Sequence, residues 1–460
     1  MVNPVPHDGL DGTRRYLAIL VVSLGTILTA LDSNIVNIAL PTIMHEFEIT
    51  PAQSVLIVNA YQIGMLVSLL PLSALGAVIG YRRVFLGGMA IFVAASLACA
   101  MSHSLVAIAM SRAVQGFGGA GIVGVLHAVV RATYPMRLLG RGLGINSMFV
   151  ASSQAAGPTV AAAILAAAPW PWLFGVNIPL GIAAIVIGAR VLPWNEISKE
   201  PYDVKSAMLS AATFGLAILA IDSVSHGGNP YVAATAFAAA ALLAPALVKR
   251  QLGRKTPFLP FDLFSNRVIP LSLVAAQAAF IGQVLAFVTL PFFLTAAGFT
   301  QVQIGLAMTP WPLAIAATSP LAGILCDRYP PWLVGAIGLA MSTMGLLLIA
   351  LLPSGAAEFD VIWRMALSGL GFGLFSPPNI RQIVAAAPKH RSGIVSGMIG
   401  TNRLIGQSIG AALAALVLNL AGTNANTVAM VLAASMTAIA ACVSLARGPV
   451  ALAAREPGQS

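Results

Sequence analysis

Charged residues are scarce in this chain, and their scarcity excludes a soluble protein. Asp, Glu, Lys and Arg together make up 8% of the 460 residues, whereas hydrophobic residues make up 58%. A soluble domain carries about 25% charged residues. The mean hydropathy of +0.90 therefore indicates an integral membrane protein with many spans, and the short alternating segments of a β-barrel are absent from the sequence.

Cysteines and acidic residues are also few. The three cysteines fall in separate apolar segments without metal-ligand spacing, so we interpret them as packing residues. The chain has 24 basic and 14 acidic residues, which gives a net charge of +10. The basic residues form no cluster with interleaved aromatics and lie in short loops between apolar segments. We therefore expect no nucleic-acid partner.

Apolar segments long enough to cross a bilayer fill most of the sequence. A span needs about 20 mostly apolar residues, and about fourteen such segments follow one another from Tyr16 onward. The first of these segments lacks the small-residue cleavage site of a signal peptide, so we interpret it as a transmembrane span. The segment "SRAVQGFGGAGIVGV" (111–125) resembles "WRMALSGLGFGLFSP" (363–377), and two related halves are typical of transporters. We expect an all-α membrane protein with a six-helix bundle at 1–200, an inserted transmembrane hairpin and linker at 201–256, a second six-helix bundle at 257–446 and a cytoplasmic tail at 447–460.

Basic residues lie in alternate loops, which sets the orientation. The loops after the even-numbered spans carry Lys or Arg, and both tails do as well, whereas the opposite loops, such as "MHEFEITPAQ" and "AAAPWPW", carry none. Because positive residues favour the cytoplasmic side, we expect both termini in the cytoplasm and the protein in the cell's inner membrane. The lipid bilayer is its expected environment, and we expect a monomer.

Two opposite charges fall at one membrane depth. Asp32 lies roughly 24 Å along the first span, and Arg112 lies about 10 Å along the fourth span, which runs the opposite way. Charges at such depth are costly and are functional-site hypotheses by default. His127 and Arg403 also fall within spans.

Three segments resemble the fourteen-helix drug:proton antiporter branch of the major facilitator superfamily. "LDSNIVNIALPTI" is similar to its first-helix motif. "SRAVQGFGGAG" resembles its fourth-helix motif, with Arg112 and Gln115 in place. "WPWLFGVNIPLG" (170–181) resembles the start of its sixth helix. The resemblance covers nearly the whole chain and implies two six-helix bundles that alternate in opening a central cavity.

Other motifs of this branch are incomplete. In the loop after the second span, Gly80, Arg82 and Arg83 are retained, but the usual Asp is replaced by Ala77. The charge clamp of that loop is therefore weakened or replaced. The loop copy in the second half keeps its acid–base pair, and the fifth-helix antiporter motif keeps one Gly-Pro step, so these conformational motifs add Asp327, Arg328, Gly157 and Pro158. Alanine at the other glycine positions still permits close helix packing.

The resemblance makes the first and fourth helices neighbours around the cavity. Asp32 is then a proton-coupling site, because burial and a nearby Arg112 pull its protonation equilibrium in opposite directions. A fixed structural ion pair is the alternative. Arg403 either balances Asp32 across the cavity or meets an anionic substrate group, since arginine does not deprotonate. His127 is either a proton relay or a packing residue.

Polar and aromatic residues at similar depth are candidates for the substrate cavity. They are Asn34, Asn37, Tyr61, Gln115, Asn146, Gln154, Gln277, Phe280, Gln283, Phe287, Trp311 and Asn402, together with Arg403. Helix–helix hydrogen bonding or packing is the alternative for each. The implied cavity is mostly apolar with one acid, which favours lipophilic cations or neutral amphiphiles.

The sequence predicts a transporter and no enzyme. "GFGGAG" lacks the Lys-Ser/Thr of a phosphate-binding loop, so no nucleotide or other cofactor is expected and the proton gradient is the expected energy source. No paired acids, metal-spaced histidines or nucleophile–base constellation occur at one depth. We therefore expect a proton-coupled exporter of lipophilic drugs and toxic compounds, with export of a single metabolite as the alternative.

Overall fold

The structure is a computed structural model that describes residues 9–195, 197–198, 201–225, 229–251, 261–352, 357–420 and 425–453. Within these residues the chain is helical and contains no strand. The first half comprises α1 (Gly12–Phe47), α2 (Pro51–Ile79), α3 (Tyr81–Ala100), α4 (Leu105–Thr133), α5 (Leu139–Ala167), α6 (Trp172–Gly175) and α7 (Asn177–Val191). A hairpin of α8 (Val204–Ser225) and α9 (Pro230–Gln251) follows.

The second half comprises α10 (Val268–Ala296), α11 (Gln301–Met308), α12 (Pro310–Arg328), α13 (Pro331–Ala350), α14 (Glu358–Ala386), α15 (Ser392–Leu420) and α16 (Ala425–Ala453). Three short 3-10 helices, Met136–Leu138, Phe261–Ser265 and Lys389–Arg391, lie in connections. Because α16 continues to Ala453, Arg447 is part of that helix and buried. The first residues of the expected tail, 447–453, thus continue α16.

Twelve helical segments in the described part are long and apolar enough to cross a membrane. Two of the fourteen expected spans do not meet this measure. The described apolar stretch of α8, Val204–Ala220, is short. The 29-residue α14 carries Glu358, Asp360 and two arginines toward its ends and several Gly, Ser and Pro residues between them, and it is not among the twelve.

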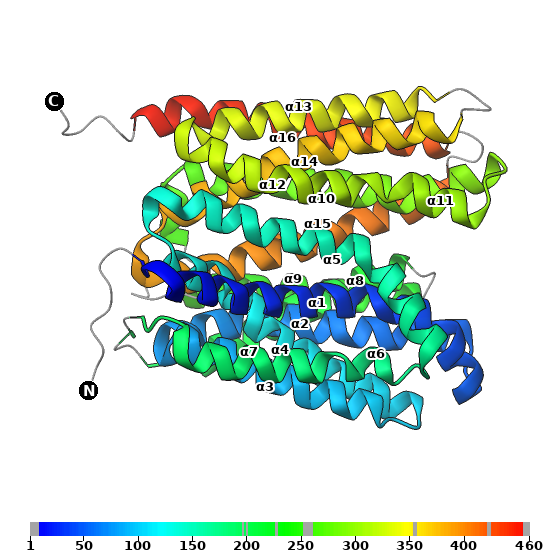
Figure 1. The fold of residues 1–460 in the computed structure, drawn as a ribbon, viewed down its shortest axis with the longest axis horizontal. Coiled ribbons are helices and arrows are strands. Elements are labelled where there is room, and N and C mark those ends of the chain that lie inside the picture. The colour runs from blue at the N-terminus through cyan, green and yellow to red at the C-terminus, as the bar shows by residue number, and fades with distance from the viewer. Residues whose placement is uncertain are drawn as a thin grey trace.

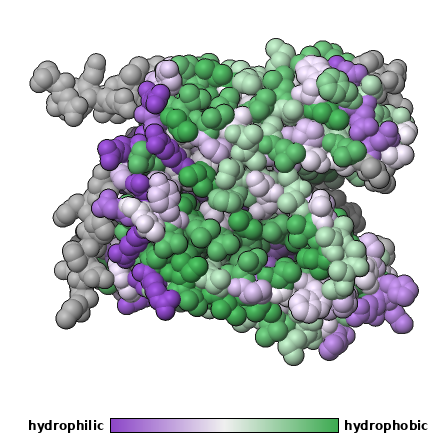
Figure 2. All heavy atoms as spheres, viewed as in Figure 1, coloured by the Kyte–Doolittle hydropathy of each residue, from purple (hydrophilic) through white to green (hydrophobic). Residues whose placement is uncertain are grey.

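The long helices run side by side along one axis, and both chain ends lie at the same end of the molecule (Figure 1). Hydrophilic residues gather mainly at the two ends, most densely at the end with both termini, and hydrophobic residues cover the visible face between them (Figure 2). This distribution matches helices that present apolar side chains to lipid while their ends face water.

Two main hydrophobic cores divide the molecule. One core is formed mostly by α1–α5 and α7, with residues such as Phe85 and Phe92. The other is formed mostly by α10–α16, with residues such as Trp311 and Phe375. The hairpin α8–α9 packs against α2 and α15. Each half therefore has its own interior, as two bundles require.

The two halves are in close contact at the end that holds the termini. A Cβ at Gly323 of α12 would lie 2.4 Å from the carbonyl oxygen of Gly140 in α5. The backbone N–H of Gly393 donates to the Tyr81 hydroxyl at 3.0 Å. Small residues let these backbones approach closely, so the halves are closed together at this end.

This contact yields a test based on the native thiol of Cys326, which is 1% exposed and lies against Gly140. We expect Gly323→Ala to push α5 and α12 apart at this end, because the added methyl group meets backbone that cannot move alone. In a Cys99→Ala/Cys442→Ala background, the rate of Cys326 labelling by a hydrophilic maleimide should then rise several-fold in the purified protein.

The matched control is Gly87→Ala, since nothing lies within 4 Å of a Cβ at that position. This control should label at the parental rate. Equal rates for the Gly323 and Gly87 variants would mean that the α5–α12 contact does not shield Cys326.

Candidate functional site

Asp32 lies in a closed polar cluster between the helices of the first half. The side chains of Asp32 and Arg112 are each 1% exposed. Arg112 Nη1 donates to Asp32 Oδ2 in a close ion pair. Asp32 Oδ1 accepts from Gln115 Nε2 at 2.8 Å and from Asn177 Nδ2 at 3.0 Å. The predicted neighbours are therefore in contact, and both carboxylate oxygens are occupied.

Arg112 makes several further contacts within the cluster. Its Nε donates to the Ile57 carbonyl at 3.3 Å, and its Nη1 also donates to Gln115 Oε1 at 2.6 Å. The guanidinium carbon lies 4.3 Å from the centre of the Tyr61 ring, a cation–π distance. Gln115 donates further to Ser96 Oγ at 2.9 Å. The cluster thus connects α1, α2, α3, α4 and α7.

Two members of this cluster, Asn177 and Ser96, were not predicted. Asn177 stands in the sixth-helix motif, as the asparagine of "WLFGVNIPLG", so the sequence carried a signal for it. Ser96 lies in the unremarkable segment "VAASLAC" of α3. Only the packing of α3 against α4 brings its hydroxyl to Gln115.

A cavity of about 540 Å³ lies between the two halves. Nine of the predicted cavity residues line it, namely Tyr61, Asn146, Gln154, Phe280, Gln283, Phe287, Trp311, Asn402 and Arg403, and so do Arg112 and His127. Its aromatic wall includes Phe280 with Phe372, whose ring centres are 5.6 Å apart, and Phe287 with Trp311, 6.1 Å apart. The cavity is therefore lined mainly by apolar side chains, with polar side chains from both halves among them.

Several other predicted residues are not in this wall. Gln115 lies behind Arg112 in the buried cluster. With its amide oriented so that both atoms are satisfied, Gln277 donates to Asn402 at 2.8 Å and accepts from the Gly406 N–H at 3.2 Å. It therefore joins α10 to α15. Asn34 and Asn37 lie in α1, and their side chains are outside the described part of the structure.

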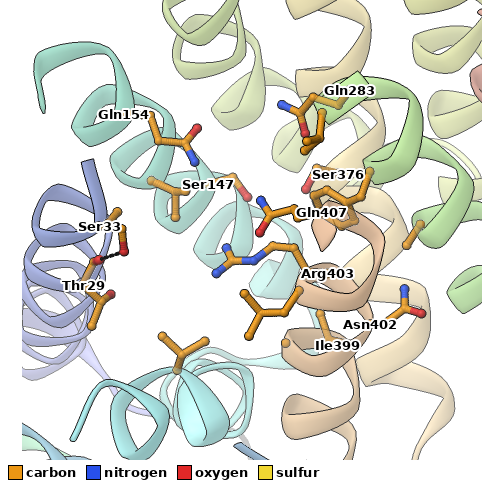
Figure 3. Close-up of a pocket in the computed structure, with 18 of the residues that line it drawn as sticks. Thr29, Ser33, Ser147, Gln154, Gln283, Ser376, Ile399, Asn402, Arg403 and Gln407 are labelled. Carbon is orange, nitrogen blue, oxygen red and sulfur yellow. Dashed lines mark hydrogen bonds between the residues drawn. The ribbon is translucent and has the colours of Figure 1, made fainter. Parts of the chain in front are cut away.

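The cavity wall differs in charge from the expectation. We expected one acid in it, but Asp32 lies behind Arg112, and the described lining residues include no Asp or Glu. They include two arginines, Arg112 and Arg403, and His127. Arg403 projects from α15 into the cavity beside Gln407 (Figure 3). The expectation of one acid in the cavity wall differs from the described lining, in which Arg112 is present and Asp32 is not.

Polar wall residues that sequence reasoning missed include Thr29, Ser33, Gln62, Ser147, Ser376 and Gln407. Figure 3 shows that Ser147 and Gln154 come from one helix and Arg403 and Gln407 from another. Gln407 follows Arg403 by four residues, so it shares a helix face with it. That spacing was available in the sequence.

His127 lies where the halves meet. It is 6% exposed, its backbone N–H donates to Ser396 Oγ at 3.0 Å, and its ring Nδ1 is 3.2 Å from the same oxygen. Ser396 belongs to α15 in the other half. This geometry holds α4 against α15, and a relay role for His127 stays a prediction.

The loop after α2 and the corresponding loop after α12 hold their neighbouring helices through different contacts. Arg82 donates to the carbonyls of Ala189 and Leu192 at the end of α7, and its guanidinium carbon lies 4.3 Å from the centre of the Trp194 ring. Carbonyls and an aromatic ring thus replace the missing acid. Gly80, with φ +104, makes the tight link between α2 and α3. Arg83 is exposed there and bonds to the Ile79 carbonyl at 3.2 Å.

In the second half the acid is retained. Asp327 lies 3.6 Å from Arg141 of α5 and 3.5 Å from Arg381 of α14. It therefore bridges the two halves, whereas the adjacent Arg328 is exposed. Gly157 is buried within α5, next to Pro158 in the same helix.

Two helical bundles around a central cavity, closed at one end and lined by polar groups from both, define a membrane transporter. The sequence profile of the Major Facilitator Superfamily matches residues 22–411. The chain belongs to this superfamily.

Similar proteins agree with this membership. The "Uncharacterized transporter YebQ" of Escherichia coli (strain K12) is 46% identical over 96% of this chain and 97% of its own. The "Tetracenomycin C resistance and export protein" of Streptomyces glaucescens is 30% identical over 89% of this chain and 76% of its own. The human organic anion transporter MFSD10 has the same fold, with a TM-score of 0.71 at 17% identity over 94% of this chain and 100% of its own.

The buried cluster yields a stability prediction. Removing one partner of a buried ion pair leaves an uncompensated charge, which costs about 3–5 kcal/mol. We expect Arg112→Gln to lower the free energy of unfolding by that amount, and Asp32→Asn in the same chain to restore part of it. Thermal and denaturant unfolding of the purified protein measure both.

Arg267→Gln is the control, because this arginine is exposed at the start of α10 and exposed charges contribute about 0–1 kcal/mol. A loss for Arg112→Gln no larger than for this control would contradict the structural importance of the cluster.

Proposed function

We propose that this protein is a proton-coupled exporter of lipophilic compounds, in the fourteen-helix drug:proton antiporter branch of its superfamily. The observation that carries the proposal is the ion pair of Asp32 with Arg112. The pair places the ionisable carboxylate of Asp32 directly behind the wall of a mostly apolar cavity. The similarity to an antibiotic export protein supports the substrate class.

In the proposed mechanism, the proton acts through Arg112. While Asp32 is ionised, it compensates the charge of Arg112 and ties α1 to α4. A proton that arrives from the outside neutralises Asp32 and leaves Arg112 as an uncompensated buried charge, which destabilises this arrangement. The bundles then rock to open the cavity inward, where the proton leaves and substrate binds. The coupling requires that the two states differ in proton affinity, and the pairing of Asp32 in one state supplies that difference.

The proposal includes a topology. We expect α8 and α14 to cross the membrane as well, since α14 packs between α12 and α13 and α8 packs on α2 and α9. Both termini would then be cytoplasmic in the inner membrane, as the distribution of Lys and Arg predicts. The contact between α5 and α12 would be the cytoplasmic closure of an outward-facing state. We expect a monomer, because each protomer contains a complete cavity.

The test is proton movement in proteoliposomes that contain an internal pH dye. A pH gradient is imposed, and lipophilic compounds of different charge are added in turn. We expect several compounds to dissipate the gradient through the wild-type protein and none to do so through Asp32→Asn, because an amide cannot carry the proton. Asp360→Asn, which neutralises a 41% exposed carboxylate, should behave like the wild type.

The results separate the proposed function from its alternatives. Uphill transport that persists in Asp32→Asn would exclude Asp32 as the coupling site. A response to one compound only would favour a dedicated exporter of a single metabolite.

A further inference from the structure

Arg403 differs from Arg112 and Arg447 because it makes no hydrogen bond and no ion pair with any described residue. Its Nε is buried without an acceptor, as is the Nε of Arg447. Arg403 nevertheless lines the cavity and points into it (Figure 3). A guanidinium at membrane depth is costly unless it is compensated, so its position calls for a ligand.

The contrast with Arg447 shows how this chain satisfies a structural arginine. Arg447 is completely buried, and no carboxylate lies near it in the described part of the chain. Its Nη1 donates to Ser272 Oγ at 2.8 Å and Asn379 Oδ1 at 2.5 Å, and its Nη2 donates to Ser444 Oγ at 2.5 Å. Arg403 has several polar side chains within the same cavity and bonds to none of them.

The charge balance of the cavity is positive. The charge of Arg112 is compensated by Asp32, and no other carboxylate is present among the described lining residues. Arg403 therefore leaves one uncompensated positive charge. A second unused donor is the indole Nε1 of Trp311, which is buried without an acceptor in the same wall.

The remainder of the wall favours an aromatic or apolar body. Phe280, Phe372 and Phe375 form a continuous edge-to-face series, with ring centres 5.6 and 6.1 Å apart. A cavity of about 540 Å³ has the size of pockets that hold drug-sized molecules. Arginine recognises carboxylates and sulfonates with paired, charge-assisted hydrogen bonds.

We infer that the substrates of this transporter are amphiphilic organic anions, with an aromatic or apolar body against the phenylalanines and a carboxylate or sulfonate on Arg403. The inference rests on the transport function proposed above and narrows it, because the positive cavity disfavours the lipophilic cations expected from the sequence. The inside-negative membrane potential favours outward movement of an anion, so export of this class is also favoured electrically.

The test is equilibrium binding to the purified full-length protein, measured by calorimetry with three probes that share one body. They are naphthalene-2-sulfonate, the neutral naphthalene-2-sulfonamide and the cationic 2-naphthyltrimethylammonium. We expect the wild type to bind the sulfonate more tightly than the other two. Arg403→Gln should weaken sulfonate binding by about tenfold or more, the value of a charge-assisted hydrogen bond, and leave sulfonamide binding nearly unchanged.

Two variants control for charge and folding. Arg403→Lys keeps the positive charge and should retain most of the preference for the sulfonate. Arg267→Gln removes an exposed arginine at the start of α10 and should bind all three probes like the wild type. If Arg403→Gln does not fold, the order of the three probes by affinity, measured on the wild type and on Arg403→Lys, still tests the preference for an anion.

Two results would overturn the inference. One is a wild type that binds the cation as tightly as the sulfonate or binds no sulfonate. The other is a folded Arg403→Gln protein with unchanged sulfonate affinity. The proposed proton coupling is tested separately: a protein that moves protons with neutral compounds but fails these binding tests keeps its function and loses this substrate class. A protein that binds the sulfonate through Arg403 without proton movement keeps the substrate class and loses the coupling.

Discussion

The first half of the molecule is organised around the ion pair of Asp32 with Arg112. A bilayer offers no water to solvate a buried charge, so each polar atom needs a partner within the protein. Here Gln115 of α4, Asn177 of α7 and the carbonyl of Ile57 in α2 supply these partners. The helices that supply these groups must stay together while Asp32 is ionised. The cluster around the ionised Asp32 therefore connects α1, α2, α3, α4 and α7.

The same requirement for a partner is met differently by the arginines of this protein. Arg112 has a carboxylate, Arg447 has hydroxyl and amide oxygens, and Arg82 has carbonyls and an aromatic ring. Each of these solutions fixes two or more helices relative to each other. Arg403 fixes none, so it is available to a ligand. Because it faces a cavity shared by both halves, a ligand bound there contacts both bundles at once.

Closure at one end depends on small residues. Gly140 and Gly323 allow the backbones of α5 and α12 to meet, and Asp327 connects the same two helices through Arg141. His127 and Ser396 add a further contact between the halves. The Asp327 side chain is 7% exposed, so the contact between the halves also includes a buried charge. The cores within each half, in contrast, consist mainly of apolar side chains.

The sequence by itself determined the class of protein, the positions of most helices, and the two charges at one depth. Hydrophobic length and the distribution of Lys and Arg are local properties, so they can be read along the chain. The common depth of Asp32 and Arg112 also followed from the rise per residue, but their pairing was expected only because the family resemblance made the first and fourth helices neighbours. Nine cavity residues were found in the same way.

Only the tertiary structure decided which atoms face the cavity. Whether a polar side chain at a given depth points to the cavity, to a neighbouring helix or to another charge depends on helix rotation and packing, which sequence spacing does not fix. Asp32 is hidden because Arg112 lies in front of it, and Ser96 joins the cluster because α3 packs on α4. Arg403 is free because no described carboxylate lies near it. The sign of the cavity's charge therefore followed from the packing of the helices and not from the count of acids and bases.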